Sequence, residues 1–293
     1  MDNDLAHMRI TIWVTLVALA LVILFATFPS IDLRFSALFF SPIGQPWPGL
    51  EPVPDRIRDT LREGVELAAF LAFVMLVGNL RLAALQRTGW RVWAFLCGPV
   101  ILCAGLLVNG VLKAMIGRAR PFSVTEFGGH QLFTPPFQFS TQCYSNCSFS
   151  SGETALIASF FLPLCVLLWP RLGRRGRLVA GGLAAAMIVL MSGLRIAAGG
   201  HFLSDVVMSI LFSALTTLFL YRALAISRHR HLFTGDAVSA DAMSLWRNGR
   251  HAVVARVLRW WPKIKARASR LQSRRIRARR HREDVQVPLQ QAR

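Results

Sequence analysis

Charged residues are scarce in this sequence, and acidic residues are the scarcest of them. Asp, Glu, Lys and Arg make up 17% of the 293 residues, against about 25% in an average soluble domain. Apolar residues make up 54%, which excludes a disordered chain because such chains bury too little apolar surface to fold. Only five cysteines are present, too few for a fold held together by disulfide bonds. The composition indicates a membrane protein.

The basic excess is concentrated at the C-terminus. The chain has 34 basic and 15 acidic residues and a net charge of +19. From Arg222 onward there are 18 basic and 4 acidic residues, whereas residues 1–221 hold 16 and 11. A uniformly basic protein would suggest a nucleic-acid partner, but here the excess belongs to a tail that follows a hydrophobic region. We therefore predict a membrane domain over residues 1–225, a basic tail over residues 226–293, and no nucleic-acid partner.

Six segments are apolar enough, and long or nearly long enough, to cross the hydrocarbon core of a bilayer. The first lacks the basic start and the small-residue cleavage site of a signal peptide, so we expect an uncleaved helix. The predicted fold class is all-α, a polytopic membrane protein with six transmembrane helices in a bundle. The six predicted spans cover residues 10–28, 65–80, 92–112, 154–169, 178–194 and 206–220.

The connecting segments set the orientation. Arginines gather in the connections 81–91 and 171–177 and in the tail. Since basic residues favour the cytoplasmic side, we expect both termini in the cytoplasm of a bacterium and a multi-pass protein in its inner membrane. The connections 29–64, 113–153 and 195–205 then face the periplasm. The first of these reads as two short interfacial helices separated by prolines, serving as a structural clip or lid.

Polar residues recur at the outer ends of four predicted spans. Charges at such depths are costly unless they are paired or functional, and this topology brings them all to one face of the membrane. The predicted site consists of Lys113, Arg120, Ser151, Gly152, Glu153, Arg195, His201 and Asp205.

These residue types suit the binding of a phosphate. Arginine makes paired contacts with phosphate oxygens and lysine adds a compact charge. The start of the fourth span, at Ser151 and Gly152, offers free backbone N–H groups to an anion. His201 and Asp205 are four residues apart, so a carboxylate can fix the imidazole tautomer and leave one nitrogen free to attack. The set describes a phosphate pocket with a histidine nucleophile that needs no metal or other cofactor. Taken singly, each cation also fits an interfacial anchor, and the His–Asp pair also fits a structural role.

The spacing of these residues resembles the three-part signature of the type-2 phosphatidic acid phosphatase family, which is related to the vanadium haloperoxidases. Lys113 and Arg120-Pro121 form K-x6-R-P, and Arg195, His201 and Asp205 form R-x5-H-x3-D. Residues 150–153, Ser-Ser-Gly-Glu, stand where the family has P-S-G-H. The resemblance covers roughly residues 10–225 and implies the same six-helix core.

The resemblance also implies roles for the site residues. His201 would attack phosphorus and form a phosphohistidine, and Asp205 would orient it. Lys113, Arg120, Ser151, the Gly152 N–H and Arg195 would hold the phosphoryl oxygens and stabilise the charge of the transition state. The implied activity is that of a metal-independent lipid phosphatase, a phosphoric ester hydrolase.

Two positions depart from the family pattern. Glu153 replaces the histidine that protonates the leaving group in the family, and Leu194 replaces a serine. A carboxyl group still serves as a general acid where desolvation keeps it protonated, and His130 is a second candidate for that role. Glu153 also leaves open an alternative from another class, a catalytically weakened protein that binds a lipid phosphate or a partner protein. A vanadate-dependent oxidase is a third interpretation, which the six spans argue against.

The substrate expected at this boundary is a phosphorylated lipid. Candidates are undecaprenyl pyrophosphate, phosphatidic acid, phosphatidylglycerophosphate and lipid A. The connection 121–149 is long and rich in phenylalanine, so it could cover a large headgroup. The form C-S-F-x-S-G-E at residues 147–153 is similar to that of a subgroup that includes lipid A 4′-phosphatase-like proteins.

Two further features lie outside the signature. Residues 241–282 alternate apolar and basic side chains at helical spacing, which predicts an amphipathic helix bound to anionic membrane lipids. Cys143 and Cys147 lie in an outer connection, where an oxidising compartment permits a disulfide. Whether one forms depends on the loop geometry, which the sequence leaves open.

Overall fold

The structure is a computed structural model that describes residues 2–43, 47–82, 87–250 and 260–262. The chain divides into two compact units, Met1–Asp241 and Ala242–Arg293. Within the described residues the secondary structure is helical, and the one β-type pairing is an isolated bridge between Val124 and Gln131. This confirms the predicted all-α fold class.

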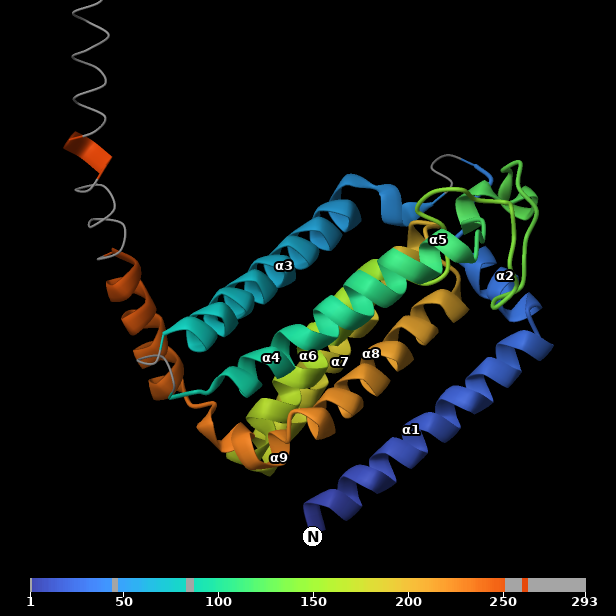
Figure 1. The fold of residues 1–293 in the computed structure, drawn as a ribbon. Helices are drawn as coiled ribbons and strands as arrows, with labels where there is room; N and C mark the ends of the chain where they lie inside the picture. Colours follow the sequence, from blue (N-terminus) through green and yellow to red (C-terminus); the bar gives the residue numbers. More distant parts are fainter. Residues whose placement is uncertain (1, 44–46, 83–86, 251–259, 263–293) are drawn as a thin grey trace, which may run out of the picture. The chain divides into compact units, whose positions relative to one another are not determined.

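Six helices are long and apolar enough to span a membrane among the described residues, as predicted. Figure 1 shows them side by side in the first unit. The third span is continuous but has a π-helical middle, a form that relaxes the backbone pitch. The spans are α1 (Asp2–Thr27), α3 (Pro52–Arg81), α4 (Trp90–Pro99) with the π-helix Val100–Leu112 and α5 (Lys113–Met115), α6 (Gly152–Leu168), α7 (Arg174–Ala197) and α8 (Leu203–Ala223).

Among its described residues, the connection predicted over residues 29–64 contains one short α-helix before α3, where two were expected. This helix, α2, covers Ser30–Ala37, and a 3-10 turn follows at Pro48–Leu50. From Pro52 the chain is already in α3, which extends the second span well beyond its predicted start at residue 65. The reason is that prolines at the first positions of a helix are tolerated, since the N–H groups there have no intrahelical partner. Pro52 and Pro54 therefore belong to the start of α3 and do not break a helix.

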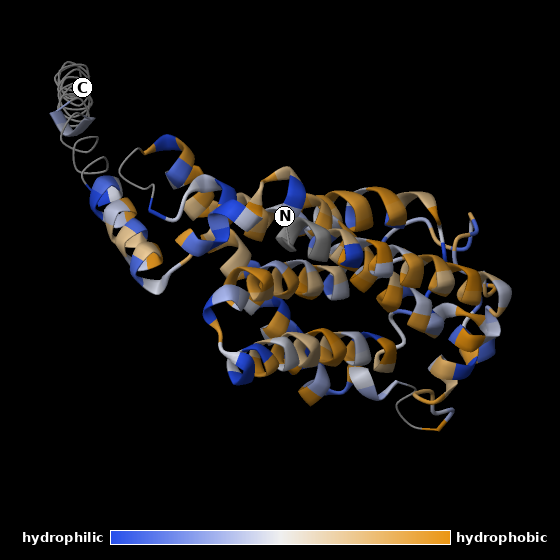
Figure 2. Cartoon of the chain, turned by 90° about the horizontal axis from the view of Figure 1, so that it is seen from below, coloured by the Kyte–Doolittle hydropathy of each residue, from blue (hydrophilic) through white to orange (hydrophobic). Residues whose placement is uncertain are grey.

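The helix α6 lies at the centre of the bundle. It packs against α3, α4, α7, α8 and the π-helix. Figure 2 shows apolar residues along the long helices, with hydrophilic residues more frequent at their ends and in the connections. Between α6 and α8, buried serines form hydrogen bonds across the interface: Ser209 Oγ donates to Ser151 O (2.9 Å), and Ser159 Oγ donates to Ser213 Oγ (3.0 Å). These bonds fix the start of α6 against the start of α8.

An aromatic cluster closes the end of the bundle where α8 begins. Trp47 lies against Phe40 and Phe127, with ring centroids 5.4 Å apart in each pair. Trp47 also packs on the backbone of Gly199, whose φ of 63° lies in the left-handed region. A Cβ at position 199 would come within 2.5 Å of the indole ring. The segment before α3 therefore packs over the turn that leads into α8.

The segment after α8 folds back, within the first unit, on the connections between α3 and α4 and between α6 and α7. It comprises α9 (Ile226–His229), a 3-10 turn at Arg230–Leu232, and helical residues 235–241. Buried Asp241 accepts hydrogen bonds from the Thr88 hydroxyl (2.6 Å) and backbone N–H (3.1 Å). The domain boundary predicted at residue 225 stays a prediction. Most of the predicted amphipathic helix over residues 241–282 lies outside the described residues.

Candidate active site

The elements that carry the predicted site residues come together at one end of the bundle, near the label α5 in Figure 1. They come from the end of the third span and the loop after it, from the start of α6, from the last turn of α7, and from the turn into α8 and its first residues. The folded chain therefore brings to one end groups that are up to 92 residues apart in the sequence, from Lys113 to Asp205.

His201 is buried, with 1% of its surface exposed. Its Nδ1 lies 2.7 Å from the backbone oxygen of Ser148. A carbonyl only accepts hydrogen bonds, so this contact assigns the ring proton to Nδ1 and leaves the lone pair on Nε2. Burial lowers the pKa of His201 from 6.5 to about 3, so the imidazole is neutral at physiological pH. His201 therefore has the protonation state that a nucleophile requires.

Asp205 is also buried, and Ser148 links it to His201. Asp205 Oδ2 accepts hydrogen bonds from Ser148 Oγ (2.5 Å) and from the backbone N–H of Phe202 (2.8 Å). It lies 3.8 Å from His201 Nδ1, beyond hydrogen-bond distance. The carboxylate thus acts on the imidazole through its charge and through Ser148, whose carbonyl and hydroxyl contact the two side chains.

A buried ion-pair network around Arg118 holds Asp205 in place. Arg118 is fully buried and donates to Asp205 Oδ1 (2.6 Å), Asp32 Oδ2 (2.8 Å) and Ser204 Oγ (2.9 Å). Asp32, in α2, accepts two further hydrogen bonds from the backbone and hydroxyl of Ser204. Because a buried charge must be paired, the network ties α2 and the loop after α5 to the start of α8.

Two of the predicted phosphate ligands share a partner, Asn146. Lys113 Nζ donates to Asn146 Oδ1 (3.1 Å), and Arg120 donates from Nε (3.0 Å) and Nη2 (2.7 Å) to Asn146 O. Asn146 lies between Cys143 and Cys147, which form a disulfide, and it has a positive φ of 49°. Burial lowers the pKa of Arg120, although a guanidinium stays charged. The loop closed by the disulfide therefore holds both cations at the site.

The start of α6 has the features of an anion-binding helix end. Ser151 is the N-cap, and its hydroxyl accepts from the Thr154 N–H (3.4 Å). The N–H groups of the first turn have no intrahelical acceptors and carry the positive end of the helix dipole. A Cβ at Gly152 would lie 2.5 Å from Asn109 Oδ1, so a larger residue there would have to displace the Asn109 side chain. The glycine thus keeps Asn109 packed against the start of α6 and leaves the backbone accessible.

Glu153 occupies the position of the family histidine and joins two arginines. Its Oε2 lies 3.6 Å from Arg195 Nε and 3.8 Å from Arg58 Nε. Arg58, in α3, also pairs with Asp55 (2.8 Å) and with Asp59 (3.0 Å). Glu153 therefore connects the second span to Arg195 of α7.

Several residues of this site escaped the sequence argument. Arg118 and Arg58 are not among the residues that the spacing motifs specify, so those motifs offered no reason to select them. Ser148 lies in the form C-S-F-x-S-G-E but received no role there, and Asp32 and Asn146 lie in no motif. The roles of all three depend on contacts 26 or more residues away. His130 is exposed, and no hydrogen bond or ion pair of the described residues joins it to the site.

Two cavities adjoin the candidate site. One of about 310 Å³ is lined by Lys113, Gly152 and Glu153 of the site, by the charged Arg62 and Glu66, and by apolar residues such as Val100 and Leu156. The other, of about 660 Å³, is formed by residues 120–146 and includes Arg120. The two cavities share no lining residue, but Asn146, which lines the second, is bonded to Lys113, which lines the first.

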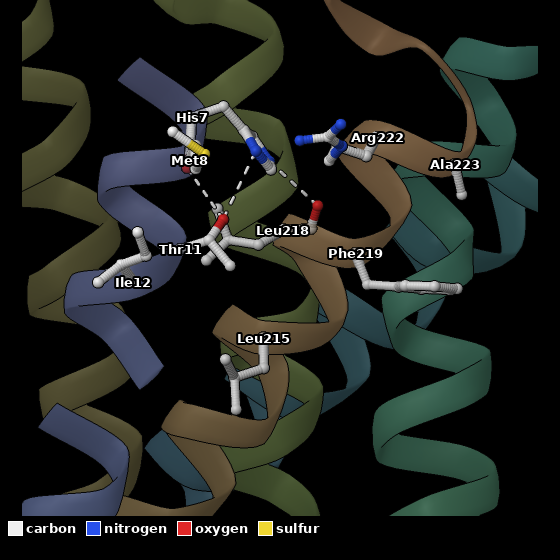
Figure 3. A pocket seen from close by; sticks show the side chains of 9 residues that line it. All are labelled: His7, Met8, Thr11, Ile12, Leu215, Leu218, Phe219, Arg222 and Ala223. Carbon is white, nitrogen blue, oxygen red and sulfur yellow. Dashed lines mark hydrogen bonds between the residues drawn. The ribbon is translucent and has the colours of Figure 1, made fainter. Parts of the chain in front are cut away.

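A third cavity, of about 600 Å³, lies toward the other end of α8 and shares no residue with the site. Figure 3 shows His7 reaching from α1 to α8, where its Nε2 is 3.1 Å from the Leu218 carbonyl. His7 also stacks on Tyr221 at a centroid distance of 4.9 Å. These contacts attach the N-terminal helix to α8.

The geometry combines a neutral, buried imidazole with a free lone pair, three cations and a helix N-terminus. This combination suits the attack of a nitrogen nucleophile on a bound phosphoryl group, whose negative charge the cations and N–H groups would stabilise.

Comparisons with known proteins agree with this chemistry. Residues 92–228 match the PAP2 superfamily. The chain is 29% identical over 200 residues to a lipid A 4′-phosphatase of Francisella tularensis subsp. novicida, covering 68% of this chain and 88% of the relative. It is 31% identical over 223 residues to a lipid A 4′-phosphatase of Rhizobium leguminosarum, covering 68% of this chain and 91% of the relative. No solved structure matches the chain.

Proposed function

Since the chain belongs to the PAP2 superfamily and is a bacterial membrane-bound lipid phosphatase, we propose that it removes a phosphate from a phosphorylated glycolipid of the lipid A type. The reaction would take place at the periplasmic face of the inner membrane. The proposal follows the names of the curated relatives, which act on lipid A, and the arrangement around His201.

In the first step, His201 Nε2 attacks phosphorus and the bond to the lipid oxygen breaks. Nδ1–H keeps its hydrogen bond to Ser148 O, and Asp205 stabilises the positive charge that develops on the imidazole. Lys113, Arg120 and Arg195 hold the phosphoryl oxygens together with the N–H groups at the start of α6. In the second step, water attacks the phosphohistidine, which releases inorganic phosphate and restores neutral His201.

The leaving lipid oxygen needs a proton, and Glu153 is our candidate donor. In the resting structure it lies between two guanidinium groups. A phosphate bound to Arg195 would compete for one of these two contacts. Glu153 would then be free to turn toward the leaving oxygen and act as its proton donor.

The cavity beside Lys113 suits the membrane-embedded part of such a substrate. Lys113 and Glu153 of the candidate site line it together with Arg62 and Glu66, and Val100, Ala104 and Leu156 add apolar surface. An amphiphile that places its phosphate on Lys113 would then have apolar surface available for the adjoining hydrocarbon chain.

The single observation that carries the proposal is the neutral, buried His201, held by Ser148 beside three cations. It is tested with purified protein in detergent or lipid nanodiscs, by measuring phosphate release from lipid A with EDTA present. Wild-type protein should release phosphate, and His201→Ala should release none. Full activity of the variant, or tight binding of lipid A by the wild type without turnover, would contradict the proposal.

A mass-spectrometric comparison of lipid A from a deletion strain and its complemented counterpart tests the substrate in the cell. Loss of the protein should leave an additional phosphate on lipid A. An unchanged phosphorylation pattern would exclude lipid A as the substrate while leaving the phosphatase mechanism open.

A further inference from the structure

The cavity formed by residues 120–146 differs in character from the interior of the bundle. It has a volume of about 660 Å³, which falls in the range of small-molecule sites. Besides Arg120, its lining holds two aromatic residues and a set of uncharged polar groups, with no carboxylate. The aromatic residues are Phe122 and Tyr144, and the polar ones include Gln131, Thr141, Gln142 and Asn146.

Such a lining fits a ligand that is rich in hydroxyl and amide groups and carries no net charge of its own. Amide and hydroxyl side chains both donate and accept hydrogen bonds, as the ring substituents of a sugar do. Tyr144 is 90% exposed and Phe122 is 46% exposed, so each offers an aromatic face to a sugar ring. With one cation and no acidic group, the cavity is poorly suited to a basic ligand.

The cavity adjoins the phosphate-binding groups. Arg120 lines it and packs its guanidinium 5.8 Å from the centroid of the Phe122 ring. Asn146 lines it too, and accepts hydrogen bonds from Lys113 and Arg120. A ligand in this cavity could therefore place a phosphate substituent on the two cations.

The position of the cavity assigns it to the headgroup. All its lining residues follow the span Trp90–Met115 and precede the span Gly152–Arg171, so it lies outside the hydrocarbon region. The 310 Å³ cavity is lined by Lys113 and lies between spans, and its lining combines charged side chains such as Arg62 and Glu66 with apolar ones such as Val100 and Leu156. A phosphorylated lipid with a carbohydrate headgroup would place the sugar in the 660 Å³ cavity and its adjoining lipid part in the 310 Å³ cavity.

The loop has internal bonds that keep the cavity in shape. Gln142 Oε1 accepts a hydrogen bond from the Leu132 N–H (2.9 Å), and the backbones of Thr125 and Gln131 are joined at 2.9 Å. The Cys143–Cys147 disulfide closes the wall that carries Asn146. The side chain of Gln131 has no hydrogen-bond partner among the described residues, so its amide is available to a ligand.

We propose that this cavity is a carbohydrate subsite that binds the sugar of a phosphorylated glycolipid while its phosphate reacts at His201. The inference rests on the proposed function and adds the residues that select the headgroup. Phosphatidic acid, which has a phosphate and acyl chains but no sugar, would use the reaction centre without this subsite.

The test compares two substrates and three variants of the full-length protein. KM and kcat are measured for lipid A and for phosphatidic acid with Gln131→Ala, Thr141→Val and the matched control Gln138→Ala, an exposed loop glutamine that does not line the cavity. Loss of one or two hydrogen bonds should raise the KM for lipid A about 5- to 10-fold in the first two variants. Their kcat, their kinetics on phosphatidic acid and the control should be unchanged.

The outcomes separate the two proposals. Equal effects on both substrates, or none on either, would overturn the carbohydrate subsite. No phosphate release from lipid A by the wild type would instead overturn the proposed function. Dephosphorylated lipid A gives a second readout that needs no turnover of its own. As a competitive inhibitor of phosphatidic acid hydrolysis, it should bind about 5- to 10-fold more weakly to Gln131→Ala than to the wild type.

Discussion

Replacing Arg118 tests the buried network on which the candidate nucleophile rests. In Arg118→Met the side chain keeps much of its length but loses its charge and all its donors. Asp32 and Asp205 would then be two buried carboxylates without a cation, since both side chains are fully buried. Removing one partner of a buried ion pair costs about 3–5 kcal/mol of stability.

The remaining bonds keep the expected loss within this range. Asp32 retains two donors from Ser204, and Asp205 retains Ser148 Oγ and the Phe202 N–H. Each carboxylate thus stays hydrogen-bonded, while the uncompensated charge accounts for the cost. Adding Asp32→Asn to Arg118→Met removes one of the two charges and should recover about 1–3 kcal/mol, the coupling expected between residues in contact.

The assay is unfolding of detergent-solubilised protein by titration with SDS, followed by tryptophan fluorescence, on the single and double variants. Arg34→Met serves as the control, because Arg34 is an exposed arginine of the same helix α2 as Asp32, and surface substitutions change stability by about 0.5 kcal/mol or less. A loss in Arg118→Met no larger than in the control would refute the reasoning. So would a double variant that is less stable than Arg118→Met.

Three further predictions concern the reaction centre. Glu153→Gln should lower kcat on lipid A about 10²- to 10⁴-fold, the usual contribution of a general acid. Turnover of p-nitrophenyl phosphate should stay nearly intact, because that leaving group needs no proton. Equal losses on both substrates would show that Glu153 acts only by holding Arg195 and Arg58. Burial lowers the pKa of His201 from 6.5 to about 3, so the unfolded chain takes up a proton below pH 6.5 that the folded protein excludes. Wild-type stability relative to His201→Gln should therefore fall by roughly 1.4 kcal/mol per pH unit below pH 6.5, which unfolding titrations at pH 7.5 and 5 check; parallel pH curves would contradict it. The double variant Cys143→Ser/Cys147→Ser should raise the KM for lipid A several-fold, because the loop that positions Lys113 and Arg120 becomes looser. Reduction of the wild-type disulfide should have the same effect. Reduction without any change in KM would argue against this role for the disulfide.

Much of this protein is determined by the order of its residues. Long apolar stretches must become helices in a bilayer, because each backbone polar group there needs an internal partner. The six spans could therefore be predicted from the positions of the long apolar segments. The polar residues near their ends, together with the motif spacing, were enough to select the eight candidate site residues. The start of α3 was predicted wrongly because a proline at a helix start and a proline in a loop look alike in sequence.

Tertiary structure decided how those candidate residues are connected. The sequence suggested a direct His201–Asp205 contact from their four-residue separation, but the fold inserts Ser148 between them. The fold also supplies contacts that the local sequence does not predict. Arg118 pairs with two buried carboxylates, Asn146 accepts from two cations, and Arg58 lies beside Glu153. Spacing along a helix determines which side chains share a face. The partners of buried charges depend on which distant segments pack together, because desolvation, and not local order, makes the pairing necessary.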